Sequence, residues 1–328
     1  MKILFVYQEL STFVKKDLDI LRSIHSVREV HFQGINNIPK LWSGVRWCDI
    51  SFSWFGKLHA FFTVLFSNAL GKKSVVISGG DDVANAIVEG KAYGLYSQLY
   101  KRWCPTFVFK NADLILAVSD SNLKEVLLNA KADSQKTKRI YHGFDTENIS
   151  LKQNQKKEEL VITVSEIIEE NVRVKGLKLF VESGALLPDI SFYLIGPWKG
   201  KSIKHLRKTS NIQFVGGKYG EDLIKLYQQA KVYVQASAQE SFGCAVAEAM
   251  LCECVPVVSK VGALPEVVGD CGFYIDKLEP KELAEKIQLA LQNPQIRKMA
   301  RERIIKMFPL ERRKEELLKA VSLLGDQR

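Results

Sequence analysis

The sequence predicts an α/β protein with two doubly wound domains. Short apolar runs, typical of buried parallel strands, alternate along the chain with segments whose apolar residues recur at helical spacing. The 328 residues, 46% of them hydrophobic, are enough for two separate cores. Loops rich in turn residues follow several of the expected strands, at the position where open α/β sheets bind ligands.

The first domain is expected over residues 1–155. It opens with a strand at residues 2–7 and a helix at 13–24, and further strands are expected at 30–32, 48–52 and 74–78. The loop after the first strand contains no glycine and matches neither the dinucleotide-binding fingerprint nor a P-loop. A dinucleotide-dependent dehydrogenase is therefore disfavoured.

Residues 57–70 form a strongly apolar helical segment. The segment is shorter than a membrane span, and Gly71 with two lysines follows it as a helix end. We expect a helix buried in the first domain, with contact to a membrane surface as the alternative.

Three polar residues of the first domain are candidates for contact with a substrate. Asp81 and Asp82 follow the strand at 74–78, where they either orient hydroxyl groups or serve as turn residues. His142 precedes Gly143 in a turn expected where the chain leaves this domain. It is either a ligand in a cleft or a structural histidine.

The second domain is expected over residues 156–309, after a polar linker at 150–159. A helix at 310–328 is expected to return to the first domain. Within the second domain, residues 236–256 read as strand, loop, helix and strand. The helix starts at Gly243, where free N–H groups and the helix dipole favour an anion such as phosphate.

Two carboxylates bracket this helix start. Glu240 lies just before the helix and Glu248 lies inside it, roughly 7 Å along the axis. Carboxylates accept two hydrogen bonds at once, which suits vicinal hydroxyl groups of sugars. A nucleotide sugar fits this pattern, with Glu240 near the transferred hexose and Glu248 near the ribose. The donor-binding residues expected around the helix start are Glu248, Ser241, Phe242, Gly243 and Cys244. For Cys244, a small core residue is the alternative.

The E-x7-E spacing with Phe242-Gly243 inside it resembles the donor-site signature of family four retaining glycosyltransferases. Further segments resemble the same family: Lys175-Gly176, the run 214–237 and the segment 262–268. The resemblance implies the GT-B fold, with two Rossmann-like domains and a cleft between them. It also implies a retaining mechanism in which the diphosphate leaves, and the hydroxyl enters, on one face of the sugar. Such a reaction requires no metal ion, no other cofactor and no protein nucleophile.

One departure from the family pattern concerns the cations. The family has Gly-Arg at the end of the first strand of this domain, where this chain has Ser165-Glu166. We expect Arg173 to supply the missing charge beside Lys175, since cations beside a diphosphate stabilise its departure. Gly216, at the end of another strand, is expected to give a nucleobase access to the backbone.

Composition limits the partners and the compartment. The net charge of +10 favours phosphorylated substrates or an anionic membrane surface, and no nucleic-acid-binding motif is present. No signal peptide or membrane span is recognisable, and the six cysteines form no disulfide or zinc pattern. We expect a cytoplasmic enzyme, with peripheral contact to the cytoplasmic face of the membrane as an option.

The sequence thus predicts a retaining, metal-independent glycosyltransferase that moves a hexose from a UDP- or GDP-sugar to a glycan, a lipid-linked glycan or a small polyol. The expected catalytic residues are Lys175, Arg173 and Glu240. A nucleotide-sugar epimerase and a phosphorylase are the enzyme alternatives on the same core. A non-catalytic protein that binds sugar nucleotides is the alternative outside catalysis.

Overall fold

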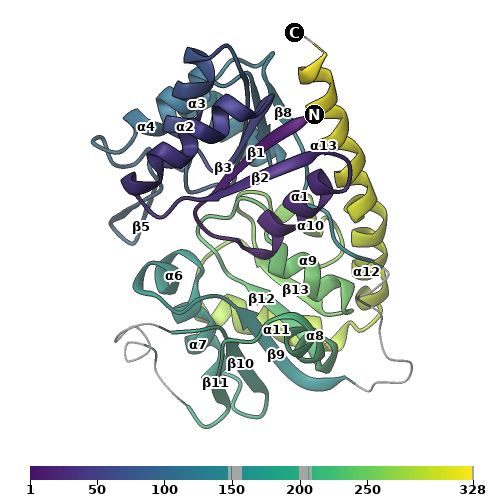
Figure 1. Cartoon of the computed structure of the whole chain (residues 1–328). Helices are drawn as coiled ribbons and strands as arrows, with labels where there is room; N and C mark the ends of the chain where they lie inside the picture. The colour runs from purple at the N-terminus through teal and green to yellow at the C-terminus, as the bar shows by residue number, and fades with distance from the viewer. Residues whose placement is uncertain (147–148, 150–156, 199–205, 207–208, 327–328) are drawn as a thin grey trace. The chain divides into compact units, whose positions relative to one another are not determined.

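A computed structural model describes residues 1–146, 149, 157–198, 206 and 209–326. The chain forms two compact units, Met1–Gly143 with Glu311–Arg328, and Phe144–Leu310. Each unit contains one parallel six-stranded sheet with helices packed against it (Figure 1). This confirms the predicted α/β class with two doubly wound sheets. The sequence placed the change of domain at residues 155 and 156, about a dozen residues after the observed division.

The first unit has its sheet in the order β2-β1-β3-β4-β7-β8, and all neighbours in it are parallel. A short antiparallel hairpin, β5 with β6, stands apart from this sheet. The strands are β1 (Lys2–Tyr7), β2 (Ser26–His31), β3 (Ile50–Trp54), β4 (Lys73–Ser78), β5 (Ala86–Val88), β6 (Lys91–Tyr93), β7 (Leu114–Ala117) and β8 (Thr137–Arg139). Strands β1, β3, β4 and β7 are almost fully buried, as expected for a sheet covered on both faces.

The helices of the first unit follow their strands as the apolar periodicity predicts. They are α1 (Thr12–Arg22), α2 (Ile38–Trp47), α3 (Leu58–Ala69), α4 (Trp103–Asn111), α5 (Asp120–Asn129) and α13 (Leu310–Gly325), with a 3-10 turn at Ile35–Asn37. Ser119 caps α5, because its hydroxyl accepts a hydrogen bond from the backbone N–H of Asn122 at 2.9 Å.

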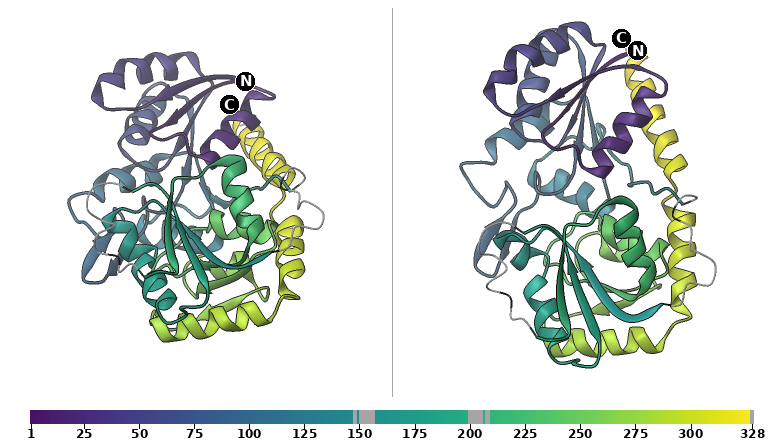
Figure 2. Two further views of the ribbon diagram at one scale, coloured as in Figure 1. Left: turned by 90° about the horizontal axis from the view of Figure 1, so that it is seen from below. Right: turned by 60° about the horizontal axis from the view of Figure 1, so that its bottom comes forward.

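A buried ion pair holds α13 in the first unit. Arg313 on α13 donates two hydrogen bonds, 2.6 and 2.7 Å long, to the carboxylate of Asp17 on α1. Both side chains are at most 1% exposed. Arg313 also donates to the carbonyl of Tyr141 at 2.7 Å, and Trp54 donates its ring N–H to Asp17 at 3.1 Å. Both chain ends consequently lie in this unit, where Met1 packs against Gly325 (Figure 2).

The second unit has its sheet in the order β11-β10-β9-β12-β13-β14, again with parallel neighbours throughout. The strands are β9 (Glu158–Val164), β10 (Ser191–Ile195), β11 (Ile212–Gly216), β12 (Ala230–Gln235), β13 (Val255–Ser259) and β14 (Phe273–Ile275). Its helices are α6 (Glu169–Val174), α7 (Leu177–Gly184), α8 (Gly220–Gln229), α9 (Cys244–Leu251), α10 (Leu264–Val268), α11 (Pro280–Gln292) and α12 (Ile296–Met307). Phe308 and Pro309 separate α12 from α13, because proline cannot continue the helix.

The polar segment expected to be a linker ends earlier than predicted. Residues 150–156 lie outside the described residues, but β9 already begins at Glu158. Lys157 is buried and donates to the backbone carbonyls of Tyr227 at 3.0 Å and Ala230 at 2.6 Å. The prediction was wrong here because a lysine that satisfies buried carbonyls has no apolar signature in the sequence.

The expected burial of the helix at 57–70 is only half correct. In α3, the side facing the sheet carries small and polar residues, namely His59, Ala60, Thr63, Val64 and Ser67. The opposite side carries larger apolar residues, and Leu58 and Leu65 are 37% and 38% exposed. In the described part of the chain, no helix is long and apolar enough to cross a membrane.

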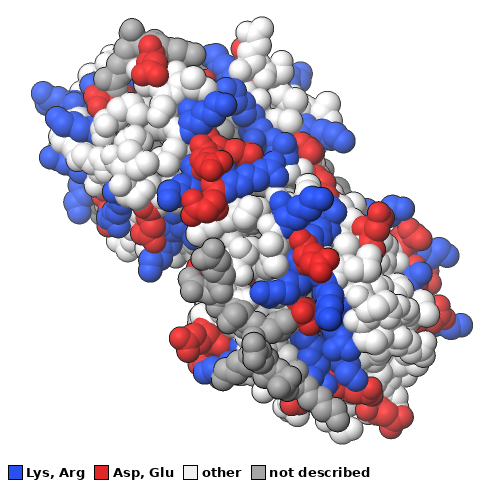
Figure 3. Space-filling view, turned by 90° about the vertical axis from the view of Figure 1, so that its right-hand side faces the viewer, with Lys and Arg blue, Asp and Glu red and all other residues white. Residues whose placement is uncertain are grey.

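Charged side chains of both signs are interspersed over the face of the protein shown in Figure 3. Lys and Arg outnumber Asp and Glu by 47 to 37 in the chain. On this face the surplus does not form a continuous basic stripe of the kind that binds a nucleic-acid backbone.

We expect Arg313→Met to destabilise the first unit by about 3–5 kcal/mol, because Asp17 would stay buried without its partner. Urea unfolding, followed by circular dichroism, measures the loss. The control Arg312→Met removes a half-exposed cation paired with Glu316 on the same helix, which is worth less than about 1 kcal/mol. A further change, Asp17→Leu in the Arg313→Met background, should restore part of the stability. Equal losses in the Arg313 and Arg312 variants would contradict this account.

Candidate active site

The candidate site of the second unit lies where the order of the strands in its sheet reverses. From β9, the chain adds β10 and β11 on one side of the sheet, and it then adds β12, β13 and β14 on the other side. This is a topological switch point, and open α/β sheets bind ligands at the carboxyl ends of the strands beside such a point. Lys175 follows β9 and Glu240 follows β12, so the fold brings the two expected stretches together.

Two glycines allow the loops at this point to approach each other closely. Gly176 has φ +66°, and a Cβ atom there would lie 2.0 Å from the carbonyl oxygen of Ala236. Gly262 has φ +54°, and a Cβ atom there would lie 1.9 Å from the carbonyl oxygen of Glu240. Backbone hydrogen bonds join the same loops, from Ala238 to Val174 at 2.8 Å and from Ala263 to Glu240 at 3.1 Å. The backbone around Glu240 is thus fixed from both sides.

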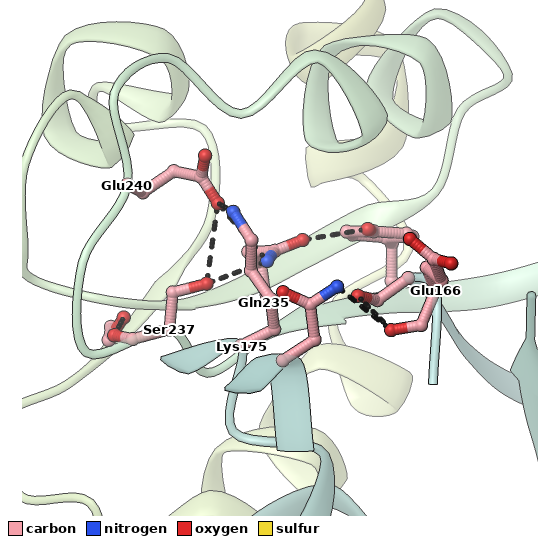
Figure 4. Close-up of polar contacts among 9 residues, drawn as sticks. Glu166, Lys175, Gln235, Ser237 and Glu240 are labelled. Carbon is pink, nitrogen blue, oxygen red and sulfur yellow. Dashed lines mark hydrogen bonds and ion pairs between the residues drawn. The ribbon is translucent and has the colours of Figure 1, made fainter. Parts of the chain in front are cut away.

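Lys175 and Glu240 form an ion pair with 2.8 Å between Nζ and Oε2. Their side chains are 24% and 11% exposed, so the pair is largely shielded from water yet reachable from one side. Figure 4 shows Gln235 and Ser237 beside Glu240. Both donate to the same carboxylate oxygen at 3.3 Å, and Gln235 also donates to the Ser237 hydroxyl at 2.7 Å.

Tyr233 supports this network from inside the sheet. Its hydroxyl donates to the amide oxygen of Gln235 at 2.8 Å. Burial and, after it, the charge of Glu240 raise the pKa of Tyr233 well above its usual value, so the hydroxyl stays a neutral donor. The sequence did not single out Tyr233, Gln235 or Ser237 as site residues. Tyr233 and Gln235 are two residues apart on β12 and therefore lie on one side of the strand, and Ser237 follows in the loop after it.

The helix start predicted at Gly243 is present. Gly243 has φ +95° and immediately precedes α9, whose first residue is Cys244. Ser241 and Cys244 are partly exposed, and Phe242 and Gly243 are buried. Phe242 packs against Phe144 and Phe308, with ring centroids 6.0 and 5.4 Å apart, so its side chain belongs to the core of this unit. Glu248 lies on the second turn of α9 and is partly exposed.

The loop after β9 accommodates Glu166 through its backbone. The Glu166 carbonyl accepts hydrogen bonds from Asn171 at 2.9 Å and from the Ser165 hydroxyl at 3.2 Å (Figure 4). The loop then forms the short helix α6, with Arg173 in its last turn and Lys175 directly after it. Arg173 and Lys175 are both partly exposed. The segment between β9 and α7 therefore carries both Arg173 and Lys175.

Gly216 ends β11 with φ +83° and is partly exposed. Its carbonyl accepts a hydrogen bond of 2.9 Å from the backbone N–H of Gly196, which follows β10. A Cβ atom at Gly196 would lie 1.9 Å from the Ser165 carbonyl oxygen, so glycine is required for this close approach. The ends of β9, β10 and β11 are therefore packed backbone to backbone.

The paired aspartates of the first unit have different environments. Asp82 is fully buried and accepts hydrogen bonds from the backbone N–H groups of Gly56 at 2.7 Å and Gly80 at 2.9 Å. Burial, followed by the neighbouring charge of Asp81, raises the pKa of Asp82 to about 6. Asp81 is 37% exposed and forms an ion pair of 2.6 Å with Lys57. Asp82 thus holds the loop as a turn residue, and Asp81 is the one that solvent reaches.

His142 lies in an aromatic pocket of the first unit. It is 6% exposed, and its ring stacks on Trp54 with centroids 5.9 Å apart. Burial, and then the nearby charges of Arg313 and Lys16, lower the pKa of His142 well below its usual value. The ring is therefore neutral at pH 7, and this environment matches a structural histidine.

No cluster of three or more His, Cys, Asp or Glu side chains is placed to hold a metal ion within the residues that the structure describes. The free cysteines of the described residues are mostly buried, whereas Cys244 and Cys271 are partly exposed.

Residues 145–307 match the model of the family described as glycosyl transferases group 1. Through these residues the chain belongs to the glycosyl transferases group 1 family. The resemblance predicted from Lys175-Gly176 and the E-x7-E segment is confirmed at the level of the family. The match covers the second unit, in which the expected donor-binding residues lie.

Curated relatives are similar over part of their length. The O-antigen chain mannosyltransferase B of Escherichia coli is 35% identical over 116 residues, which are 34% of this chain and 30% of that protein. The sulfoquinovosyl transferase of Arabidopsis thaliana is 27% identical over 212 residues, 59% of this chain and 40% of that protein. The chain thus spans less than half the length of these relatives.

Solved structures are similar over nearly the whole chain. HepE of Anabaena in complex with UDP has a TM-score of 0.80 at 18% identity, covering 98% of this chain and 100% of that one. Sucrose-phosphate synthase of Thermosynechococcus elongatus has a TM-score of 0.78 at 15% identity, with both chains fully covered. These are GT-B proteins, and the predicted GT-B class is confirmed.

We expect Gly262→Ala to disturb the site more than Gly220→Ala does. Both glycines have nearly the same left-handed φ, +54° and +53°, but a Cβ at Gly262 meets the backbone of Glu240, whereas a Cβ at Gly220 meets nothing within 4 Å. Gly220→Ala should cost about 1 kcal/mol from backbone strain alone. Gly262→Ala should cost more, on the order of 2–3 kcal/mol, because the Glu240 loop must also shift. Thermal unfolding of both variants checks this, and equal melting temperatures would contradict it.

Proposed function

We propose that this protein is a retaining glycosyltransferase that takes a hexose from a nucleotide diphosphate sugar and requires no metal ion. The observation that carries the proposal is the Lys175–Glu240 pair at the switch point of the second sheet. It combines a cation for a leaving diphosphate with a carboxylate for sugar hydroxyls. The family membership of residues 145–307 and the UDP bound to the similar HepE support the same donor class.

In the proposed reaction, the cations stabilise the leaving group. The bond between the anomeric carbon and the diphosphate breaks, and the electron pair leaves with the diphosphate oxygen. Lys175, Arg173 and the N–H groups at the start of α9 neutralise the charge that develops there. The acceptor hydroxyl forms the new bond on the same face of the sugar, and its proton passes to the departing diphosphate. Configuration is retained without a covalent enzyme intermediate.

The two carboxylates position the donor in this proposal. Glu240 accepts hydrogen bonds from hexose hydroxyls, and its own place is fixed by Gln235 and Ser237. Glu248 accepts from the ribose hydroxyls, and Ser241 and Cys244 contribute backbone groups near the phosphates. Gly216 gives the base access to the backbone. In the first unit, Asp81 is the candidate for contact with the acceptor, because Asp82 and His142 are buried.

The acceptor in this proposal is a hydroxyl group of a glycan, a lipid-linked glycan or a small polyol. The name of one relative, a Campylobacter jejuni N-acetylgalactosaminyltransferase, places its sugar on a diphospho-undecaprenol-linked saccharide. Another relative is an O-antigen chain mannosyltransferase. Both support a glycan acceptor. We also propose that the enzyme acts in the cytoplasm, where nucleotide sugars are its co-substrates.

A panel of UDP- and GDP-sugars in a thermal-shift assay identifies the donor, since a ligand at about 100 times its dissociation constant adds roughly 2.7 kcal/mol of stability. With that donor and an acceptor mixture, we expect Lys175→Met and Glu240→Gln each to lower turnover on the order of 100-fold or more. Arg173→Ala should have a comparable effect. Chelators should leave turnover unchanged.

Lys178→Met is the matched control, because Lys178 is 59% exposed on α7 and pairs with Glu182 on the surface of the same helix. It should retain nearly full turnover. Conversion of donor alone into another nucleotide sugar would instead identify an epimerase, and dependence on orthophosphate a phosphorylase. Tight donor binding without turnover in the presence of glycan acceptors would favour a binding protein. Product inverted at the anomeric carbon would overturn the retaining mechanism.

A further inference from the structure

Helix α3 has apolar residues on both of its sides. Its inner side combines Ala60 and Val64 of the core with polar contacts, since His59 bonds to the Trp54 carbonyl at 2.6 Å and Ser67 bonds to Ser51 at 2.8 Å. Phe61, Phe62 and Phe66 are partly buried against the cores of the unit, and Leu58 and Leu65 on the outer side are 37% and 38% exposed. A helix at the surface of a water-soluble protein normally turns its apolar side inward. The outer side of α3 therefore suits an apolar partner.

The apolar side of α3 continues onto the helices beside it. α2, α3 and α4 lie next to one another in the first unit (Figure 1). Trp42 of α2 contacts Phe66 with ring centroids 5.1 Å apart. The ring of Phe62 lies 6.1 Å from that of Phe66 and 5.3 Å from that of Phe61. Phe61 contacts Trp103 and Phe107 of α4 at 5.2 and 4.8 Å. We call these six linked rings the aromatic face.

The edge of the aromatic face projects into solvent. Trp103 is 55% exposed and Trp42 is 39% exposed. In the loop before α4, Leu99 and Tyr100 are each 72% exposed. Tryptophan, tyrosine and leucine at such exposure are costly in water and favourable at the boundary between lipid headgroups and acyl chains.

The charges within the elements of the aromatic face have one sign, and the first carboxylates beyond them include Asp49 after α2 and Asp81, which pairs with Lys57 just before α3. The chain contains 37 Asp and Glu residues, yet α2, α3, α4 and the loop 94–102 contain none. The same elements carry exposed cations, including Lys40 and Arg46 on α2 and Lys101 and Arg102 beside Trp103. Lys101 also lies over the ring of Tyr100, 5.5 Å from its centroid. A protein partner needs no such complete exclusion of carboxylates, whereas an anionic bilayer repels each one.

We propose that the aromatic face docks the first unit onto an anionic lipid bilayer. The aromatic and leucine side chains enter the headgroup region, and the flanking lysines and arginines contact lipid phosphates. The helix α3, with 12 residues, is too short to span the hydrocarbon core, so the face lies on the membrane surface. This docking is independent of the proposed transferase reaction, and it is measured without any sugar donor.

Sedimentation of the full chain with vesicles tests the proposal. Wild-type protein should bind vesicles of phosphatidylcholine mixed with phosphatidylglycerol, bind pure phosphatidylcholine much more weakly, and detach as salt rises. Lys101→Glu with Arg102→Glu should weaken binding to the anionic vesicles at least about tenfold. Leu99→Ser with Tyr100→Ser should also weaken it, at unchanged net charge, because these side chains supply the apolar contact.

Lys281→Glu with Lys298→Glu is the matched control, because both lysines are exposed in the second unit and the formal charge falls by four in each double variant. This control should bind like wild type. The proposal is overturned if the control loses as much binding as the Lys101 and Arg102 variant, or if wild type does not sediment with anionic vesicles. It is also overturned if wild type does not bind vesicles and forms a stable dimer that the Leu99 and Tyr100 variant converts into a monomer. Light scattering measures this change. Circular dichroism melting of each variant shows that it is folded.

Discussion

The ion pair between Lys175 and Glu240 requires two loops to meet at backbone distance. Lys175 and Glu240 are 65 residues apart in the chain, and their loops follow strands that are neighbours only in the folded sheet. Glycine at positions 176 and 262 is what permits the approach, because any Cβ there would overlap a carbonyl oxygen. An ion pair that is mostly shielded from water gains little net stability after desolvation. We propose that a ligand at this switch point takes over the charges of the pair.

The support of Glu240 extends inward along β12. Tyr233, Gln235 and Ser237 form a continuous line of hydrogen bonds that ends at the carboxylate. A neutral, buried tyrosine at its base keeps the direction of each donor fixed. Preorganised polar groups of this kind need not rearrange when a charged ligand binds, which is the condition for strong electrostatic stabilisation.

The first unit uses a different device to include distant parts of the chain. Arg313 and Asp17 are 296 residues apart, and their bidentate pair is completed by two backbone carbonyls and the Trp54 ring N–H. Because all of these polar groups find partners, the buried charges are tolerated. The same unit leaves Leu58 and Leu65 of α3 exposed, with no carboxylate in α2, α3 or α4.

The sequence by itself determined the α/β class, the alternation of elements, the family and the stretches around Lys175 and Glu240. These features depend on local periodicity, on glycines at tight turns and on short motifs, all of which a linear sequence records. The predicted boundary between the two domains lay too far along the chain. Lys157 is buried, but it stands in a polar segment that reads as a linker.

The tertiary structure alone decided which residues meet. It buried Asp82 and left Asp81 exposed to solvent, and it placed His142 in an aromatic pocket. It also brought Gln235 and Ser237 into contact with Glu240. It also showed that α3, predicted to be buried, exposes its apolar side. Burial and pairing depend on contacts between segments far apart in the chain. A pattern of residues along the chain does not contain them.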